Sequence, residues 1–225
     1  MWLVFMNYEI LKKICYIIFN IMGLLVPFFM CIIKKKKYNI SFEFIFYSFM
    51  MFLIGFLIFS KLFYCISELK LINIFTLTKE ELFSFIISGQ SFIGGYLGGI
   101  LLLLLYIKIS NSNKNDILSI YTLSLPLMYS IMKIGCYLAG CCEGKYFTNI
   151  QLLESIINII CFISIYIFIK NNNKIIKCSL IIFGTYRFII YFLRNYSTTY
   201  NLIIVQIITL FYIFYGIIYN TNDIK

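Results

Sequence analysis

Long apolar segments follow one another along this chain, and each is bounded by charged or polar residues. The segments cover residues 14–33, 41–60, 83–107, 117–140, 150–169, 178–193 and 202–219. Each is close to the roughly 20 residues that a helix needs to cross a bilayer. The chain is 62% hydrophobic and 12% charged, whereas soluble domains hold about 45–50% apolar and about 25% charged residues. We therefore predict an all-α membrane protein, a bundle of about seven transmembrane helices forming one domain over residues 1–225.

The net charge of +10 comes mainly from lysines at the ends of the apolar segments, which is typical of membrane-flanking residues and gives no indication of nucleic-acid binding. With the N-terminus outside, ten Lys and Arg residues fall on the cytoplasmic side, including the block 34–37, and seven fall outside. This bias predicts an external N-terminus and a cytoplasmic C-terminus. Lys12 and Lys13 oppose that assignment.

Lys133 and Arg187 lie inside predicted spans. A charge at membrane depth costs at least about 2.5–3.5 kcal/mol and is a candidate for function by default. The alternative is that the side chains extend to the interface, which fits Lys133 better than Arg187. Arg194 follows Arg187 by seven residues, so the two are expected to share one helix face.

Four polar motifs interrupt the apolar background. They are residues 88–99, 133–144 and 151–154, and residues 184–188 together with Arg194. In the predicted topology all four lie in the outer half of the bilayer on different helices. We therefore predict one site that faces the outer leaflet.

The residue types in these motifs favour an anionic lipid as ligand. Arginine offers a planar fork of donors that suits phosphate, and lysine adds a point charge. Gln90 and Ser91 are candidate donors to a lipid headgroup. Gly94 and Gly95 permit close approach of the backbone, although tight helix packing is the favoured explanation of such glycines taken alone.

Acidic and sulfur-containing residues complete the candidate site. Glu154 lies in a span and needs a cationic partner, for which Lys133 or Arg187 is the natural choice. Glu154 or Glu143 is a candidate general base, or part of a structural ion pair. Cys141 and Cys142 are candidate reactive thiols near cations, but small hydrophobic filler is the favoured interpretation. The chain has no histidine, and the cysteine spacing does not predict a metal site.

At these residues the sequence resembles the prolipoprotein diacylglyceryl transferase family of bacterial membranes. Residues 89–95 are similar to its Ser-Phe-His-Gly-Gly segment, residues 133–144 to its glycine-rich signature, Gln151 to Glu154 to its Gln-Leu-Tyr-Glu, and Arg187 with Arg194 to its arginine segment. Gln206 matches a glutamine that opens the last span. The resemblance covers about residues 83–219 in the family's order.

The resemblance implies a seven-helix bundle in the plasma membrane that moves the diacylglyceryl group of phosphatidylglycerol to the lipobox cysteine of a prolipoprotein, without a cofactor or metal. It makes Arg187, Arg194, Lys133 and Glu154 candidate catalytic residues. Candidate substrate-binding residues are Gln90, Ser91, Gly94, Gly95, Gly135, Glu143, Gly144 and Gln151. The family's histidine position is Ile93 here, and the acid of its arginine segment is Tyr191.

Two other functions stay open at this point. One is an enzyme of the same fold that acts on another lipid or acceptor, with Cys141 or Cys142 as a nucleophile. The other is a membrane protein that binds or moves lipid without catalysis.

Overall fold

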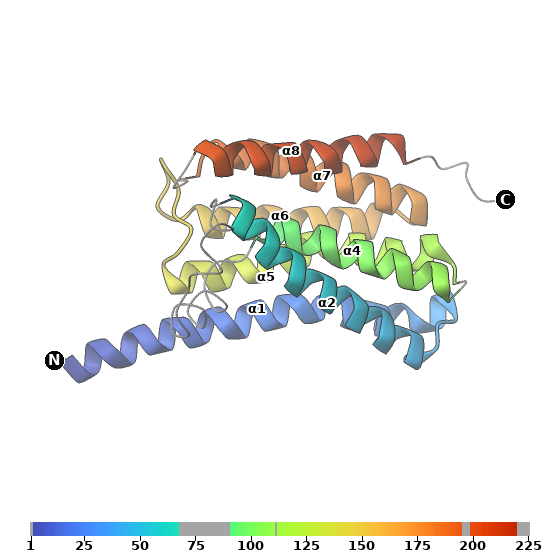
Figure 1. The fold of residues 1–225 in the computed structure, drawn as a ribbon, viewed down its shortest axis with the longest axis horizontal. Coiled ribbons are helices and arrows are strands. Elements are labelled where there is room, and N and C mark those ends of the chain that lie inside the picture. The colour runs from blue at the N-terminus through green and yellow to red at the C-terminus, as the bar shows by residue number, and fades with distance from the viewer. Residues whose placement is uncertain (1, 68–90, 111, 195–198, 220–225) are drawn as a thin grey trace. The chain divides into compact units, whose positions relative to one another are not determined.

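The computed structural model describes residues 2–67, 91–110, 112–194 and 199–219, and helices make up nearly all of that part of the chain (Figure 1). The helices are α1 (Trp2–Tyr38), α2 (Phe42–Ser67), α4 (Phe92–Ile109), α5 (Lys114–Ala139), α6 (Ile150–Phe168), α7 (Asn172–Tyr191) and α8 (Thr199–Ile218). Each contains one of the predicted apolar segments or most of it. The predicted residues 83–90 lie outside the described part.

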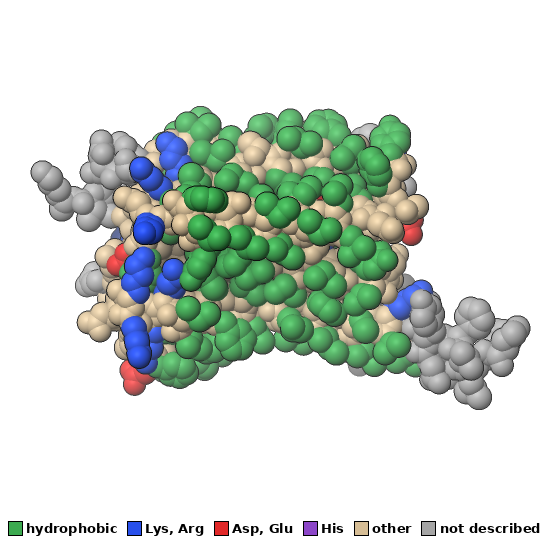
Figure 2. Space-filling model, turned by 180° about the vertical axis from the view of Figure 1, so that it is seen from behind, with side chains coloured by type: hydrophobic (Ala, Val, Ile, Leu, Met, Phe, Trp, Pro, Cys, Tyr) green, Lys and Arg blue, Asp and Glu red, His purple; other side chains and the backbone are tan. Residues whose placement is uncertain are grey.

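Five of these helices, α1, α2, α4, α5 and α6, are long and apolar enough to cross a membrane. Helix α7 carries Lys174, Lys177 and Arg187, and the apolar stretch Val205–Ile218 of α8 is shorter. Figure 2 shows apolar side chains over the visible face, with Lys and Arg gathered towards one edge of it. The protein is a polytopic helical membrane protein, as predicted.

Helix α6 shows how the sequence sorts its side chains in a lipid solvent. Large apolar residues recur every three or four positions on its exposed face: Leu153, Ile156, Ile160, Ile163 and Ile167. Its buried face holds the polar residues Gln151, Glu154, Ser155 and Asn158. A helix in lipid exposes apolar side chains without cost, so polar groups gather where the neighbouring helices can satisfy them.

The described chain divides into two compact units. The first contains α1, α5, α6, α7 and the part of α8 from Thr209 onwards. Helix α5 is buried on almost all sides, and it packs on α1 where a Cβ at Gly135 would lie 2.7 Å from Cβ of Phe19. Helix α7 packs on α8 in the same way, because a Cβ at Gly184 would lie 2.8 Å from Cγ1 of Ile213.

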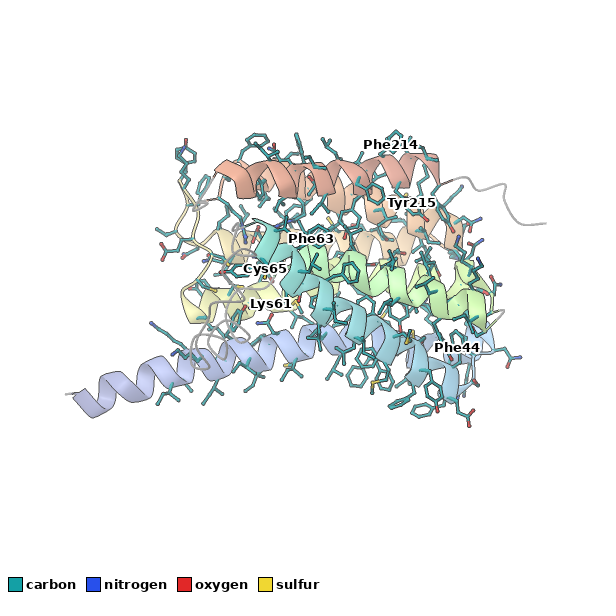
Figure 3. The ribbon with its side chains drawn as sticks, viewed as in Figure 1. Phe44, Lys61, Phe63, Cys65, Phe214 and Tyr215 are labelled. Carbon is teal, nitrogen blue, oxygen red and sulfur yellow. The ribbon has the colours of Figure 1, made fainter. Side chains whose placement is uncertain are left out.

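The second unit contains α2, α4 and the first half of α8. Glycines on α4 fit against aromatic rings of α2. A Cβ at Gly94 would lie 2.3 Å from Cβ of Phe63, which Figure 3 labels, and one at Gly98 would lie 2.2 Å from Cβ of Phe59. Small residues allow helices to approach closely in lipid, where dispersion contacts replace the hydrophobic effect as the source of association.

Candidate functional site

Glu154 is the centre of a buried charged cluster in the first unit. It lies in the second turn of α6, and its side chain is 0% exposed. One carboxylate oxygen, Oε2, lies 3.3 Å from Nζ of Lys133 on α5. The other, Oε1, lies 3.5 Å from Nη1 of Arg187 on α7. The side chains of Lys133 and Arg187 are each 7% exposed, so both are enclosed by the surrounding protein.

Arg194 adds a third cation to the same carboxylate. Its Nη2 donates a hydrogen bond to Oε2 of Glu154. Among the described residues the cluster holds three cations and one carboxylate, all of them almost completely buried. Buried charges need close partners, and three cations gathered at one place favour an anionic ligand.

The prediction that Arg187 and Arg194 share one face of one helix was wrong, because only Arg187 lies in a helix. Helix α7 ends at Tyr191, so Arg194 lies in the turn beyond it. The turn is fixed by the loop after α5, because the Lys145 N–H donates to the Leu193 carbonyl oxygen at 2.8 Å and Gly144 forms a β-bridge with Arg194. A Cβ at Gly144 would lie 2.4 Å from the Phe147 carbonyl oxygen, which explains a glycine there.

Tyr129 is a member of the cluster that the sequence did not reveal. Its hydroxyl accepts a hydrogen bond from Nη1 of Arg187 and donates one to Oε1 of Glu154 at 3.3 Å. Nζ of Lys133 and Cζ of Arg187 lie 5.1 and 5.0 Å from the centre of its ring, within the range of cation–π attraction. The available signal was its spacing, since Tyr129 precedes Lys133 by four residues on one face of α5.

Gln151 and Glu143 lie in or beside the loop that follows α5, but they differ in burial. Gln151 is 2% exposed, and its Nε2 donates to the carbonyl oxygen of Cys141 at 2.6 Å. Its Oε1 has no hydrogen-bond partner among the described residues. Glu143 is exposed. Gln151 therefore fixes the position of the loop, whereas the structure places Glu143 on the surface.

Cys136 near the end of α5 and two cysteines of this loop lie together. The sulfur atoms of Cys136, Cys141 and Cys142 are all within 4.8 Å of one another. Hydrogen bonds from the Cys136 and Cys141 thiols, aided by the charges of Lys133 and Arg194, lower the pKa of the Cys142 thiol below its usual range. Cys142 is exposed and Cys141 partly so, and the roles of the two thiols, small hydrophobic filler or reactive group, stay predictions.

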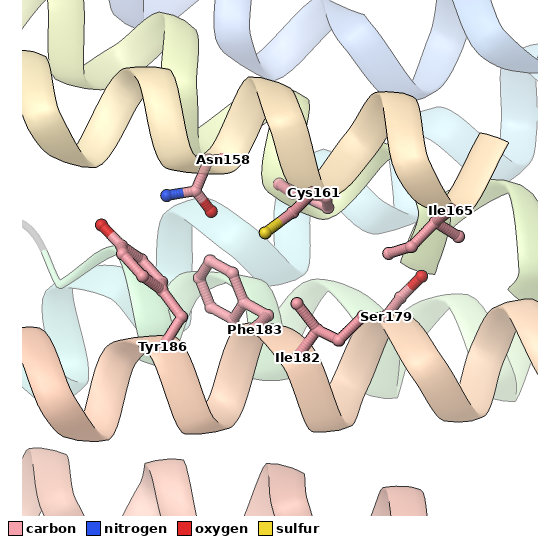
Figure 4. A pocket seen from close by; sticks show the side chains of 8 residues that line it. Asn158, Cys161, Ile165, Ser179, Ile182, Phe183 and Tyr186 are labelled. Atoms are coloured by element: carbon pink, nitrogen blue, oxygen red, sulfur yellow. The ribbon is translucent and has the colours of Figure 1, made fainter. Parts of the chain in front are cut away.

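A small pocket lies between α5, α6 and α7, one turn or more from Glu154 along α6 (Figure 4). Its lining residues are Pro126, Asn158, Cys161, Ile165, Ser179, Ile182, Phe183 and Tyr186. Figure 4 shows Asn158 and Tyr186 at one end and Ser179 at the other. The hydroxyls of Tyr186 and Ser179 are buried and have no hydrogen-bond partner among the described residues. The pocket is therefore polar at both ends although it lies inside the helical bundle.

Residues 91–99 of the first polar motif belong to the second unit, and the rest of the motif, including Gln90, lies outside the described residues. Ser91 caps α4, because its Oγ accepts a hydrogen bond from the Gly94 N–H at 3.4 Å. A Cβ at Gly95 would lie 2.9 Å from Cβ of Ser60 on α2. Ser91, Gly94 and Gly95 thus have structural roles within their unit, as does Gly135 against α1 in the first.

The sequence matches the family described as prolipoprotein diacylglyceryl transferase over residues 4–221. This match covers nearly the whole chain, including the first eighty residues. The chain belongs to the prolipoprotein diacylglyceryl transferase family. Its family is therefore one of transferases in lipoprotein biosynthesis, as predicted.

One curated relative in this transferase family is named phosphatidylglycerol–prolipoprotein diacylglyceryl transferase and comes from Clostridium tetani (strain Massachusetts / E88). It is 29% identical over 185 residues, which cover 72% of each chain. Two positions at which the chain departs from the family pattern are buried apolar or aromatic sites. Ile93 is 2% exposed and Tyr191 is 0% exposed.

Proposed function

We propose that this protein transfers the diacylglyceryl group of phosphatidylglycerol to the thiol of a lipobox cysteine in a prolipoprotein. The observation that carries the proposal is the convergence of three buried cations from different segments at Glu154. Lys133, Arg187 and Arg194 surround one carboxylate, and a phospholipid phosphate supplies the negative charge that such a cluster favours.

The reaction is a displacement at carbon. The thiolate form of the acceptor cysteine, a few per cent of the thiol near neutral pH, attacks the glycerol carbon of the diacylglyceryl group that bears the phosphate. A carbon–sulfur bond forms and the carbon–oxygen bond to phosphate breaks. The electron pair of the broken bond leaves with glycerol phosphate, and the thiol proton goes to solvent.

In this scheme the cations bind the phosphate and stabilise the charge that develops on the leaving group. Arg187 and Arg194 supply planar donors and Lys133 supplies a point charge. Both carboxylate oxygens of Glu154 are already paired with these cations, and Oε1 accepts a hydrogen bond from Tyr129 as well. We therefore assign Glu154 a positioning role in preference to that of a general base.

The site is proposed to face the outer leaflet. At the opposite end of the first unit, the end of α1 lies beside the start of α7, where the Tyr38 hydroxyl donates to Oδ1 of Asn172 at 2.7 Å. That end carries the lysine block 34–37 together with Lys174 and Lys177. The positive-inside rule assigns such an end to the cytoplasm, which favours an external N-terminus and a cytoplasmic C-terminus.

Complementation tests the proposal. The chain is expressed in a bacterium depleted of its own diacylglyceryl transferase, and lipidation of a reporter prolipoprotein is followed by gel shift. We expect a shift that is lost in Arg187→Ala and retained in Lys145→Ala, which removes an exposed cation from the loop after α5. Absence of a shift from the wild-type chain would contradict the proposal, provided that the chain is present in the membrane and that the purified protein also fails with phosphatidylglycerol.

A further inference from the structure

The loop after α5 brings together three thiols that the proposed transfer reaction does not use. The sulfur atoms of Cys136, Cys141 and Cys142 lie within 4.8 Å of one another, and none forms a disulfide. The other described cysteines are distributed along the helices. The question is what this arrangement of three sulfurs binds.

The backbone at the end of α5 produces the arrangement. Helix α5 stops at Ala139, and Gly140 adopts a left-handed φ of 66°. The Gly140 N–H donates to the carbonyl oxygen of Tyr137, and the Cys141 N–H donates to that of Cys136, each at 3.0 Å. This is the Schellman motif, which places the residue after the glycine against the residue five positions earlier. It therefore brings Cys141 to Cys136.

The third thiol is held by an unusual backbone conformation. Cys142 has a φ of 64°, a left-handed value that costs a non-glycine residue on the order of 1–2 kcal/mol. Such conformations persist where the surrounding structure fixes them, and they are common at ligand sites. Here Gln151 holds the loop through the Cys141 carbonyl oxygen at 2.6 Å, and the Lys145 N–H holds it through Leu193 at 2.8 Å.

The spacing suits a soft metal ion. Thiolate sulfurs lie about 2.3 Å from Zn²⁺, so three of them around one ion are about 4 Å apart. Small rotations about the Cys side-chain bonds bring sulfurs now within 4.8 Å to that distance. Cys142 is exposed and Cys141 partly so, which gives an ion a path of entry. Catalytic zinc sites likewise use three protein ligands and leave one position open.

The charges around the loop are also favourable. Three thiolates and one divalent cation carry one net negative charge. Lys133 precedes Cys136 by three residues on α5. A thiolate complex at this place therefore adds an anion near the three cations that contact Glu154.

We propose that Cys136, Cys141 and Cys142 form a binding site for one thiophilic d¹⁰ cation, Zn²⁺ or its spectroscopic substitute Cd²⁺, with the fourth coordination position open. Binding replaces the thiol protons, which are released to water. The site is separate from the transfer reaction and does not depend on it. It links the end of α5 to the loop that carries Gly144 and Lys145.

Cadmium titration of the purified full chain tests the site. The chain is reduced, freed of reductant in detergent and titrated with Cd²⁺, while sulfur-to-cadmium charge-transfer absorption is recorded. We expect saturation at one ion per chain and reversal by Zn²⁺. Each of Cys136→Ser, Cys141→Ser and Cys142→Ser is expected to weaken binding at least about tenfold, since even outer-shell changes at metal sites cost that much. Cys178→Ser, a partly exposed cysteine on α7, is the matched control.

Thiol protection provides a second measurement on the wild-type chain, which removes any dependence on variants that fail to fold. The chain is alkylated with iodoacetamide in the presence and absence of Cd²⁺, and modified cysteines are mapped by mass spectrometry. Joint protection of Cys141 and Cys142 supports the site. Protection of Cys142 alone, equal protection of Cys178, or saturation at one ion in a chain lacking all three thiols would overturn it. None of these measurements uses transferase activity, so failure of the metal site and failure of the proposed reaction are distinguishable.

Discussion

Two helix contacts in this protein are stabilised by different kinds of interaction. In the second unit α2 and α4 meet through glycines that fit against Phe59 and Phe63. In the first unit α5, α6 and α7 meet through Glu154 and its cations, supported by a hydrogen bond of 2.8 Å between the hydroxyls of Ser130 and Ser155. Close packing of side chains stabilises the contact between α2 and α4, whereas buried polar groups stabilise the contact among α5, α6 and α7.

The comparison teaches where chemistry is expected in a membrane protein. Close packing of small and aromatic residues gains dispersion energy and needs no polar group. A buried charge, in contrast, is costly unless it is paired. The cluster at Glu154 is therefore poorly explained by helix association alone, and its three cations are what the proposed phosphate site needs.

The largest expected effect comes from removing the carboxylate at the centre of the polar contact. Glu154→Gln removes the carboxylate charge that Lys133, Arg187 and Arg194 share, and breaking a buried ion pair costs about 3–5 kcal/mol. We expect a markedly lower thermal unfolding temperature in detergent and loss of reporter lipidation. Glu143→Gln, an exposed neighbour, serves as control. Unchanged unfolding of Glu154→Gln would show that the ion pairs do not stabilise this contact.

Tyr129→Phe tests the polar contact more finely. The change keeps the aromatic ring under Lys133 and Arg187 but removes the hydroxyl that joins Arg187 to Glu154. Hydrogen bonds to charged groups contribute about 1.5–3 kcal/mol, so we expect kcat/KM to fall by about tenfold to a hundredfold. Kinetics with purified chain and phosphatidylglycerol measure this. An unaltered kcat/KM would place Tyr129 outside the catalytic arrangement.

Gly98→Ala tests the contact held by shape. The new Cβ would lie 2.2 Å from Cβ of Phe59. Because rotation of the Phe59 side chain does not move its own Cβ, the two helices would have to separate to relieve this clash. Overpacking of this kind costs about 1–3 kcal/mol. We expect a lower unfolding temperature, with residual activity per folded molecule unchanged. Leu101→Ala, an exposed position on α4, is the control, and equal losses in the two variants would refute close packing as the source of stability.

The smallest expected effect is at the cap of α4. Ser91→Ala removes the side-chain oxygen that accepts from the Gly94 N–H, and the loss of such a cap costs about 1 kcal/mol. Ser91→Asp, which restores an acceptor, is expected to recover the stability. If lipidation falls in both variants while unfolding stays unchanged, Ser91 contacts substrate in addition to capping the helix.

The helices were largely predictable because a helix that crosses lipid needs about 20 predominantly apolar residues, which are visible in the sequence. Apolar runs at 150–169 and 117–140 correspond closely to α6 (Ile150–Phe168) and α5 (Lys114–Ala139). The pairing of Glu154 with Lys133 and Arg187 was also predictable, since a buried carboxylate requires a cation. These inferences depend only on composition and charge.

Other features depend on backbone geometry or on aromatic residues that hydropathy does not distinguish. Phe192 and Leu193 extend the apolar run, so the end of α7 at Tyr191 was not visible and Arg194 was assigned to the helix. Tyr129 resembled an ordinary core residue in an aromatic-rich chain. The meeting of Cys136 with Cys141 follows from the left-handed Gly140, which the residue type suggests but does not specify.

The β-bridge between Gly144 and Arg194 makes one guanidinium depend on two segments of chain. Arg194 is held in place by a backbone pairing with a loop about fifty residues earlier in the sequence, and that loop also contains Cys141 and Cys142. An insertion or deletion between α5 and α6 would therefore displace a cation of the site without altering any residue of α7. The Lys145 N–H donates to the Leu193 carbonyl oxygen, so this amide exchanges with deuterium only when the contact between the two segments opens. Its protection from exchange therefore measures the local stability of the contact that positions Arg194.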